Sequence, residues 1–225
     1  MSPKLRRILT QYGLLMACLL VLGVFLLLPI YLTVKGGITE TVTIDGQETT
    51  RFTTEHVAMV FQNSLYREGL INAFFIACMT TVLCVLIALP LAIISARYKF
   101  PFKGVWNAVI LVPLILPPFV GAIGMRAVLG REGMFNAVFD TDFDVLGKAR
   151  VWGVILVEAL PLYPIIYLNA TAALANLDPA LDEAAENLGA GPVRRFFKII
   201  LPLIRPGLFA GATIVFIWSF TELGT

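Results

Sequence analysis

Two carboxylic acids, Glu158 and Glu222, stand inside long apolar runs, where an ionisable side chain is costly and is therefore a candidate for function. Glu158 follows the start of its run by seven residues, and Glu222 follows the start of another by about fifteen. If both runs are membrane-crossing helices, the carboxylates lie at a similar depth, ~10 Å below the outer surface. Facing a water-filled passage, they would attract a cation and disfavour an anion. Arg126, near the outer end of a third run, offers the alternative of a structural ion-pair network with either carboxylate.

The same two carboxylates could act as an acid and a base, which defines a rival class, a membrane-embedded enzyme. No nucleophile or metal-ligand set accompanies them, and the sequence contains no phosphate-binding loop, serine-nucleophile elbow or His-Glu-x-x-His pair. His56 is the single histidine, and the cysteines lack the spacing of a zinc or redox site. We therefore predict no catalytic residue, cofactor or metal site, and packing roles for the three cysteines, which all fall in apolar runs: Cys18, Cys78 and Cys84.

Composition places these residues in an integral membrane protein, because 58% of the chain is hydrophobic, only 14% is charged and the mean hydropathy is +0.85. The charged residues collect between apolar runs that are each long enough to cross a hydrocarbon core of about 30 Å as a helix. The pattern predicts an all-α polytopic membrane protein, since the strands of a barrel would alternate. The last run continues to the end of the sequence, which suggests a fragment. The predicted spans cover about residues 14–34, 70–95, 105–129, 151–175 and 207–225.

Basic residues between the runs orient the chain, because Lys and Arg favour the cytoplasmic side in short loops. The segments 35–69 and 130–150 are richer in acids and are expected outside; they carry Glu40, Asp45, Glu48, Glu55, Asp140, Asp142 and Asp144. The basic clusters, and with them the N-terminus, are expected in the cytoplasm; they are Lys4, Arg6 and Arg7, then Arg97, Lys99 and Lys103, then Arg194, Arg195, Lys198 and Arg205.

Three segments follow from this layout. Residues 1–35 are predicted to be an uncleaved first span, because the apolar stretch exceeds that of a signal peptide and no small-residue cleavage site closes it. Residues 36–69 form an external segment, in which the alternation around Asp45-Gly46 indicates a small hairpin, with a disordered loop as the alternative. Residues 70–225 hold the other spans. Prolines in the third and fourth predicted spans predict hinges or static bends: Pro113, Pro117, Pro118, Pro161 and Pro164.

The polar segment 178–202 carries signals for two short helices. Asp178 as N-cap, Pro179 at the first helical position and Gly189 as a stop predict a helix over about residues 179–188. A second helix starts with Pro192 and ends near residues 201–202, with an apolar stripe beside basic residues. Such a pair could lie on the bilayer surface and meet anionic lipid, or it could dock a soluble partner.

Residues 183–202 read EAAENLGAGPVRRFFKIILP and contain seven defined positions at fixed spacing. They resemble the signature loop of permease subunits in binding-protein-dependent ABC importers, in which the loop inserts into a cleft of the ATP-binding subunit. The resemblance implies an ATPase-coupling loop, and small residues that allow close approach fit that role. The matching positions are Glu183, Ala184, Ala185, Gly189, Ile199, Leu201 and Pro202.

The resemblance extends over roughly residues 60–225, through Asn72, the 113–118 region and the sequence Ser-Phe-Thr-Glu at 219–222. It implies a MetI-like permease bundle, truncated in its last spans, in the plasma (inner) membrane. Among subfamilies the chain is most similar to ferric iron permeases, with polyamine and aminoethylphosphonate permeases close. The implied partners are cytoplasmic ATP-binding cassette subunits that carry all ATP hydrolysis, an external solute-binding protein, a second permease half and membrane lipid, but no nucleic acid. The alternative of another class is a membrane anchor or sensor whose loop recruits a cytoplasmic partner.

Overall fold

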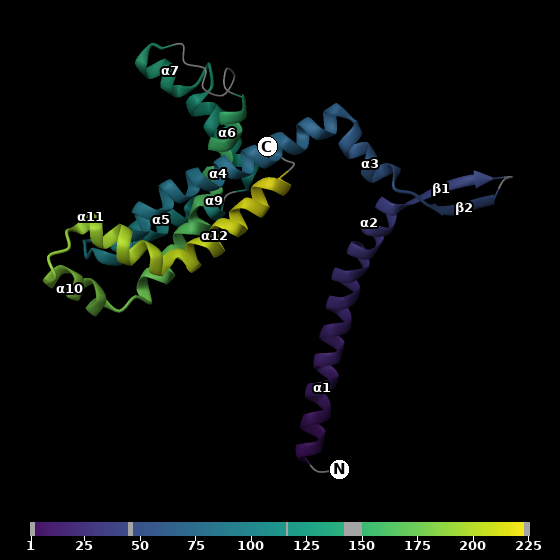
Figure 1. Cartoon of the computed structure of the whole chain (residues 1–225), viewed down its shortest axis with the longest axis horizontal. Helices are drawn as coiled ribbons and strands as arrows, with labels where there is room; N and C mark the ends of the chain where they lie inside the picture. Colours follow the sequence, from purple (N-terminus) through teal and green to yellow (C-terminus); the bar gives the residue numbers. More distant parts are fainter. Residues whose placement is uncertain (1–2, 45–46, 116, 142–149, 223–225) are drawn as a thin grey trace. The chain divides into compact units, whose positions relative to one another are not determined.

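The computed structural model describes residues 3–44, 47–115, 117–141 and 150–222. The chain divides into two compact units, residues 1–70 and residues 71–225, and each unit has its own architecture (Figure 1). Four helices in the described part are long and apolar enough to cross a membrane, or five if one broken pair counts as a single span. The higher number equals that of the five predicted runs.

The first unit contains one long helical stretch and a hairpin. Gln11–Ile38 forms the candidate span, and its apolar side chains are exposed within this chain, as expected of a helix that faces lipid. A two-stranded antiparallel hairpin follows, with Thr39 opposite Phe52 and Ile44 opposite Gln47. The predicted turn residues, Asp45 and Gly46, lie outside the described residues. The elements are α1 (Pro3–Leu22), η1 (Gly23–Leu27), α2 (Leu28–Ile38), β1 (Thr39–Ile44), β2 (Gln47–Phe52) and α3 (Glu55–Gln62).

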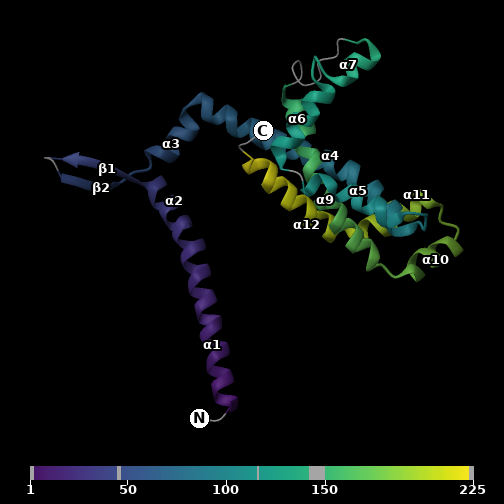
Figure 2. The same ribbon diagram turned by 180° about the vertical axis from the view of Figure 1, so that it is seen from behind.

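The second unit is a helical bundle that begins within α4. Figures 1 and 2, seen from opposite sides, both place α10 and α11 at one end of the bundle made by α4, α9 and α12. The acidic residues Asp142 and Asp144 lie outside the described residues. The elements are α4 (Ser64–Arg97), α5 (Lys103–Ile115), α6 (Pro118–Leu129), α7 (Met134–Phe139), α9 (Arg150–Ala175), α10 (Pro179–Asn187), α11 (Pro192–Arg195), η2 (Phe196–Ile200) and α12 (Leu201–Thr221).

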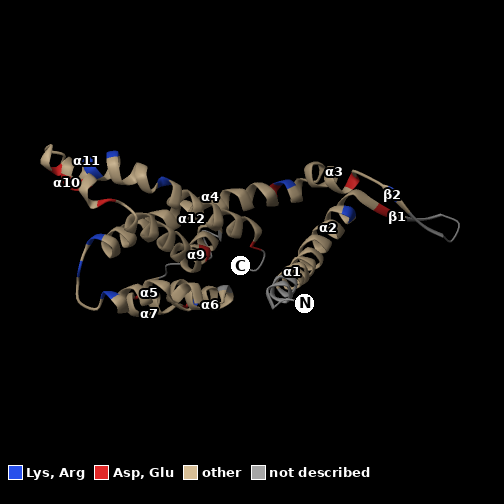
Figure 3. Cartoon of the chain, turned by 90° about the horizontal axis from the view of Figure 1, so that it is seen from below, with Lys and Arg blue, Asp and Glu red and all other residues tan. Residues whose placement is uncertain are grey.

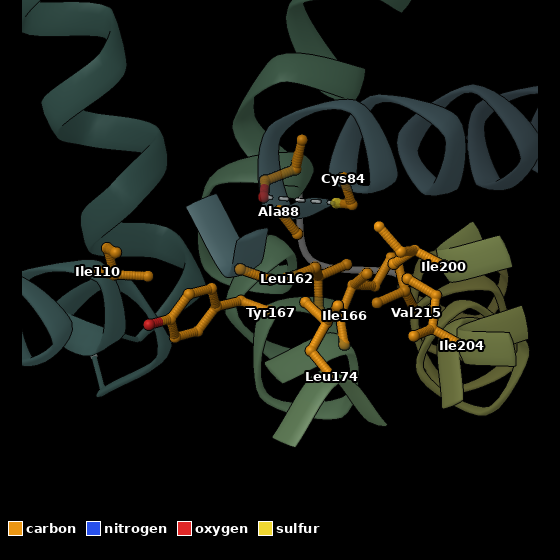
Figure 4. Close-up of a cluster of buried hydrophobic side chains, with 13 residues drawn as sticks. Cys84, Ala88, Ile110, Leu162, Ile166, Tyr167, Leu174, Ile200, Ile204 and Val215 are labelled. Carbon is orange, nitrogen blue, oxygen red and sulfur yellow. Dashed lines mark hydrogen bonds between the residues drawn. The ribbon is translucent and has the colours of Figure 1, made fainter. Parts of the chain in front are cut away.

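Helix α9 is the centre of this bundle. In Figure 4, Tyr167 of α9 points towards Ile110 of α5, while Ile166 lies beside Val215 and Ile204 of α12. Small side chains line the buried face of α4, which lets helix backbones approach closely without a hydrophobic driving force from water. These buried residues of α4 are Ala77, Thr80, Cys84, Ala88, Ala92 and Ser95.

Two glycines bring α12 against α9. A Cβ placed on Gly207 would lie 2.7 Å from the Cβ of Ala173, and one placed on Gly211 would lie 3.1 Å from the Cα of Ile166. Both contacts are shorter than ordinary van der Waals distances, so the glycines allow a helix approach that any larger residue would prevent. The spacing of four residues puts both glycines on the same face of α12.

The predicted third span, residues 105–129, is not one helix. It consists of α5 and α6, and the stretch Lys103–Ile115 is bent by 106° relative to Phe119–Phe139, which includes α6 and α7. Pro117 has extended backbone angles, φ −56° and ψ 139°, and is followed directly by Pro118. Two consecutive residues without an N–H remove two helical hydrogen bonds, and a residue before proline disfavours the α region. The prolines therefore break the helix where a hinge or a static bend was expected.

The second loop helix does not end near residues 201–202, as predicted, but continues as α11, η2 and α12 from Pro192 to Thr221. The N–H of Leu201 donates to the carbonyl of Phe196, a step of five residues that defines the π turn η2. This wider turn directly precedes Pro202, which has no N–H to donate, and the helix continues beyond it. The π turn η1 precedes Pro29 in the same way.

Candidate functional site

Helix α10, in the segment predicted to couple to an ATPase, has the predicted boundaries. The Asp178 carboxylate accepts a hydrogen bond from the N–H of Ala180 at 2.9 Å and caps the first turn. At the other end, Gly189 has φ +80°, its N–H donates to the carbonyl of Glu186 at 2.8 Å, and the N–H of Ala190 donates to that of Ala185 at 3.0 Å. This pair of bonds is a Schellman motif, which requires a left-handed residue at the position of Gly189.

The predicted coupling residues of α10 face two different directions. Glu183 and Ala184 are exposed, as is Leu188, which is 87% exposed although it is apolar. Ala185, in contrast, is 8% exposed and faces the interior of this chain. The outer face of α10 is therefore available to a partner through Glu183 and Ala184, whereas the small size of Ala185 serves packing within the permease.

The C-terminal half of the predicted motif lies in the bundle wall. Ile199 belongs to η2, and Leu201 and Pro202 open α12; all three are partly buried. Ile200, which the motif does not define, is 4% exposed and belongs to the hydrophobic core. These residues anchor the loop to α12.

Charged residues hold α10 to its surroundings. Arg97 at the end of α4 places its Nη1 2.8 Å from Oδ2 of Asp182, and Arg195 of α11 places its Nη1 2.5 Å from Oε2 of Glu186. In Figure 3, basic and acidic residues gather at α10 and α11, while the helices of the bundle are mostly uncharged. A cavity of about 380 Å³ lies beneath α10; its walls include Arg97, Leu174, Asp182 and Leu203.

Glu158 lies inside the bundle and joins three helices. Its side chain is 4% exposed, and Oε2 accepts hydrogen bonds from the hydroxyl of Thr80 on α4, at 3.3 Å, and from that of Ser219 on α12. The structure thus brings Glu158 together with two hydroxyls that were not predicted to meet it. Glu222 directly follows α12 and is exposed, and Arg126 is exposed in the last turn of α6.

A second polar cluster escaped prediction. The Oδ1 of Asn107 on α5 accepts hydrogen bonds from the hydroxyls of Ser95 at 2.8 Å and Tyr167 at 3.0 Å. The Tyr163 hydroxyl donates to the carbonyl of Ile110 at 2.9 Å. These residues follow no motif. A polar side chain inside an apolar run needs a hydrogen-bond partner, and this rule alone could have identified them from the sequence.

The cysteines differ from one another. Cys84 is buried and its thiol donates to the carbonyl of Ala159 at 3.5 Å, which fits the predicted packing role. Cys18 is exposed on α1, so its predicted packing role is not fulfilled within this chain. The described residues hold no group of three or more His, Cys, Asp or Glu side chains arranged to bind a metal ion.

Comparisons with known proteins agree on one family. Residues 88–224 match the family "Binding-protein-dependent transport system inner membrane component". The chain is 33% identical over 157 residues to the molybdenum transport system permease protein ModB of Escherichia coli K12, covering 68% of this chain and 69% of that protein. It is 30% identical over 172 residues to the ferric transport system permease protein FbpB of Actinobacillus pleuropneumoniae, covering 74% of this chain but 23% of that protein.

A polyamine permease is also similar in sequence, and an alginate transporter is similar in fold. A spermidine/putrescine transport system permease protein, PotB of Haemophilus influenzae, is 30% identical over 158 residues, covering 68% of this chain and 55% of PotB. The fold is similar to that of a bacterial ABC transporter involved in the import of the acidic polysaccharide alginate, with a TM-score of 0.69 and 18% identity over 98% of this chain and 76% of that one. With its apolar helices and its matching sequence, the chain belongs to the family of binding-protein-dependent transport system inner membrane components and is a multi-pass ABC importer permease.

Proposed function

We propose that this chain passes a solute, received from an external binding protein, into the cytoplasm by alternating access. A separate cytoplasmic ATPase docks on α10, and its closure upon ATP binding moves the spans. The chain hydrolyses no ATP itself. In this arrangement the N-terminus is cytoplasmic, and a complete pore needs a second permease half.

The main support for this proposal is the outer face of α10. A nine-residue helix would be marginal alone in water, but its N-cap, its Schellman turn and its ion pairs fix this one in place. It then presents Glu183, Ala184 and the apolar tip Leu188 outwards. An exposed leucine beside a small residue suits insertion into a cleft of a soluble protein. A helix lying on lipid would be expected to present its basic residues together with its apolar face, whereas α10 contains no Lys or Arg.

For the substrate we propose a small ion, with ferric iron as the first candidate. Carboxylates at Glu158 and Glu222 favour a cation if the pathway opens between α9 and α12 during transport. Molybdate is the second candidate, because the molybdenum permease of E. coli is 33% identical and is matched over 69% of its length. Polyamine and aminoethylphosphonate complete the set to be compared.

The test is uptake into membrane vesicles that contain the full-length permease with its ATPase and binding-protein partners. Labelled ferric iron, molybdate, spermidine and aminoethylphosphonate are supplied separately, with and without ATP. ATP-dependent accumulation of iron that is not reduced by the other solutes supports both the function and the substrate. Accumulation of molybdate alone overturns the cation proposal and leaves the importer intact. A complex in which the ATPase fails to bind the permease contradicts the proposed function.

We expect the double substitution of Glu158→Gln and Glu222→Gln to reduce uptake of a cationic solute at least tenfold, because both negative charges of the proposed pathway are removed. The glutamine carbonyl at position 158 still accepts hydrogen bonds from Thr80 and Ser219, so the bundle should remain folded. Uptake and the amount of permease in the membrane are measured together. Glu68→Gln, an exposed acid near the start of α4, is the matched control. Unchanged uptake in the double variant would show that Glu158 joins helices and has no role in the pathway.

A further inference from the structure

Helix α10 is tied to span α4 across a large distance in sequence. The guanidinium of Arg97, the last residue of α4, donates to Oδ2 of Asp182 at 2.8 Å, and 85 residues separate the two in the chain. Arg97 thus connects the end of a membrane-crossing helix to the first turn of the loop helix, where Asp182 lies. A displacement of α10 would act on α4 directly through this contact.

The ion pair belongs to a small network that orders the Asp182 carboxylate. Oδ1 of Asp182 lies 3.8 Å from Nε of Arg195, whose Nη1 lies 2.5 Å from Glu186. The side chains are partly shielded, with exposures of 33% for Arg97, 25% for Asp182 and 16% for Arg195. Shielded charges interact more strongly than charges fully surrounded by water. Arg97 donates a charge-assisted hydrogen bond to Oδ2 of Asp182, whereas Oδ1 is buried without a hydrogen bond to any described residue and lies only within ionic range of Arg195. Arg97 is therefore the hydrogen-bonding partner that positions Asp182, and Arg195 adds electrostatic attraction.

Beneath the network, a cavity interrupts the packing of α10 on the bundle, although Ala185 of the same helix is buried. The cavity of about 380 Å³ separates it in part from the ends of α4 and α9 and from the start of α12, and Leu177, Ile200 and Leu203 contribute to its walls. Close packing would transmit movement through many contacts at once. Above a cavity, the ion pair carries a larger share of the mechanical connection between α10 and α4.

We propose that the Arg97–Asp182 pair is the link that transfers movement of the ATPase-docked helix α10 to span α4. Arg97 is a positioning residue that touches neither ATP nor the transported solute. This inference rests on the proposed function, since it assumes that an ATPase moves α10. It goes further by assigning the route from the loop into the bundle to one pair of side chains.

The experiment uses the complete transporter with three variants, Arg97→Gln, Asp182→Asn and the double substitution. ATP hydrolysis, solute uptake and the amount of ATPase bound to the permease are measured on the same preparations. We expect each single variant to bind its ATPase normally and to transport at least fivefold less solute per ATP hydrolysed. The double variant should lose no more than the more severe single variant, because both changes remove the same interaction. Arg97→Lys, which keeps the charge but loses the fork geometry, should recover part of the coupling.

Lys99→Gln is the matched control, because Lys99 is an exposed cation two residues beyond Arg97. Normal uptake per ATP in both single variants overturns the inference, as does a loss of uptake that follows a loss of ATPase binding. Additive losses in the double variant also overturn it, since the two residues would then act separately. If the unaltered transporter takes up nothing and binds no ATPase, the proposed function itself fails, which is a different result from all of these.

Discussion

Replacement of Gly207 by valine is expected to force α12 away from α9 and to lower the free energy of unfolding of the bundle by about 2 kcal/mol or more. The added Cβ would lie 2.7 Å from the Cβ of Ala173 and 3.2 Å from the carbonyl oxygen of Asn169. Neither group is the flexible end of a long side chain, so a helix has to shift. The shift would also disturb the contact of Ser219 with Glu158 further along α12. Thermal unfolding of the purified permease in detergent measures the effect, with a fall in Tm of roughly 5 °C expected.

Gly124→Val supplies the control for helix propensity and added volume. Gly124 lies in α6, also a helix, and a Cβ there meets nothing within 4 Å. We expect it to leave Tm close to that of the unaltered protein. Equal melting of both variants would show that α9 and α12 do not approach as closely in the membrane as they do in this structure.

Gly189→Val is expected to reduce transport at least tenfold while the permease still inserts in the membrane. Gly189 has φ +80°, and a β-branched residue is strained there by roughly 1–2 kcal/mol or more. No neighbouring atom lies within 4 Å of a Cβ at this position, so the effect comes from the backbone alone. Relief of the strain would undo the Schellman turn and redirect the exposed tip of α10. Uptake, ATP hydrolysis and the amount of permease in the membrane are compared.

Two further variants separate backbone conformation from other effects. Gly189→Asn should retain most transport, because asparagine tolerates the left-handed region better than other residues. Gly191→Ala should also transport, since Gly191 has φ −65° and open space around its Cβ position. If valine at position 189 transports normally, the turn does not need to be rigid, and the docking proposal for α10 loses its main support.

Local chemistry accounts for what could be predicted from the sequence. The limits of α10 depend on an N-cap at Asp178 and on a glycine at position 189, both within a few residues of the helix. Apolar length likewise predicts the spans, because the bilayer imposes it. The family resemblance of the loop was confirmed by the match over residues 88–224.

Features that depend on distant parts of the chain could not be predicted. No local pattern brings Arg97 to Asp182, or Thr80 and Ser219 to Glu158, because these partners meet only after the helices pack.

The outcome at the prolines was also only partly predictable. The prolines of the third span predicted a hinge or a bend, but the sequence did not determine that the helix would break and bend by 106°. Nor did it reveal that a π turn would carry a helix past Pro202.

The inward orientation of Ala185 changes what the family signature means. Of two neighbouring alanines, Ala184 lies on the surface and Ala185 lies against the permease itself, with 8% of it exposed. Under the proposed docking, a larger side chain at Ala184 would meet the ATPase, whereas a larger side chain at Ala185 must be accommodated by the same polypeptide. If α10 docks as proposed, these two neighbouring alanines are therefore constrained by different polypeptides, Ala184 by the ATPase and Ala185 by the permease itself.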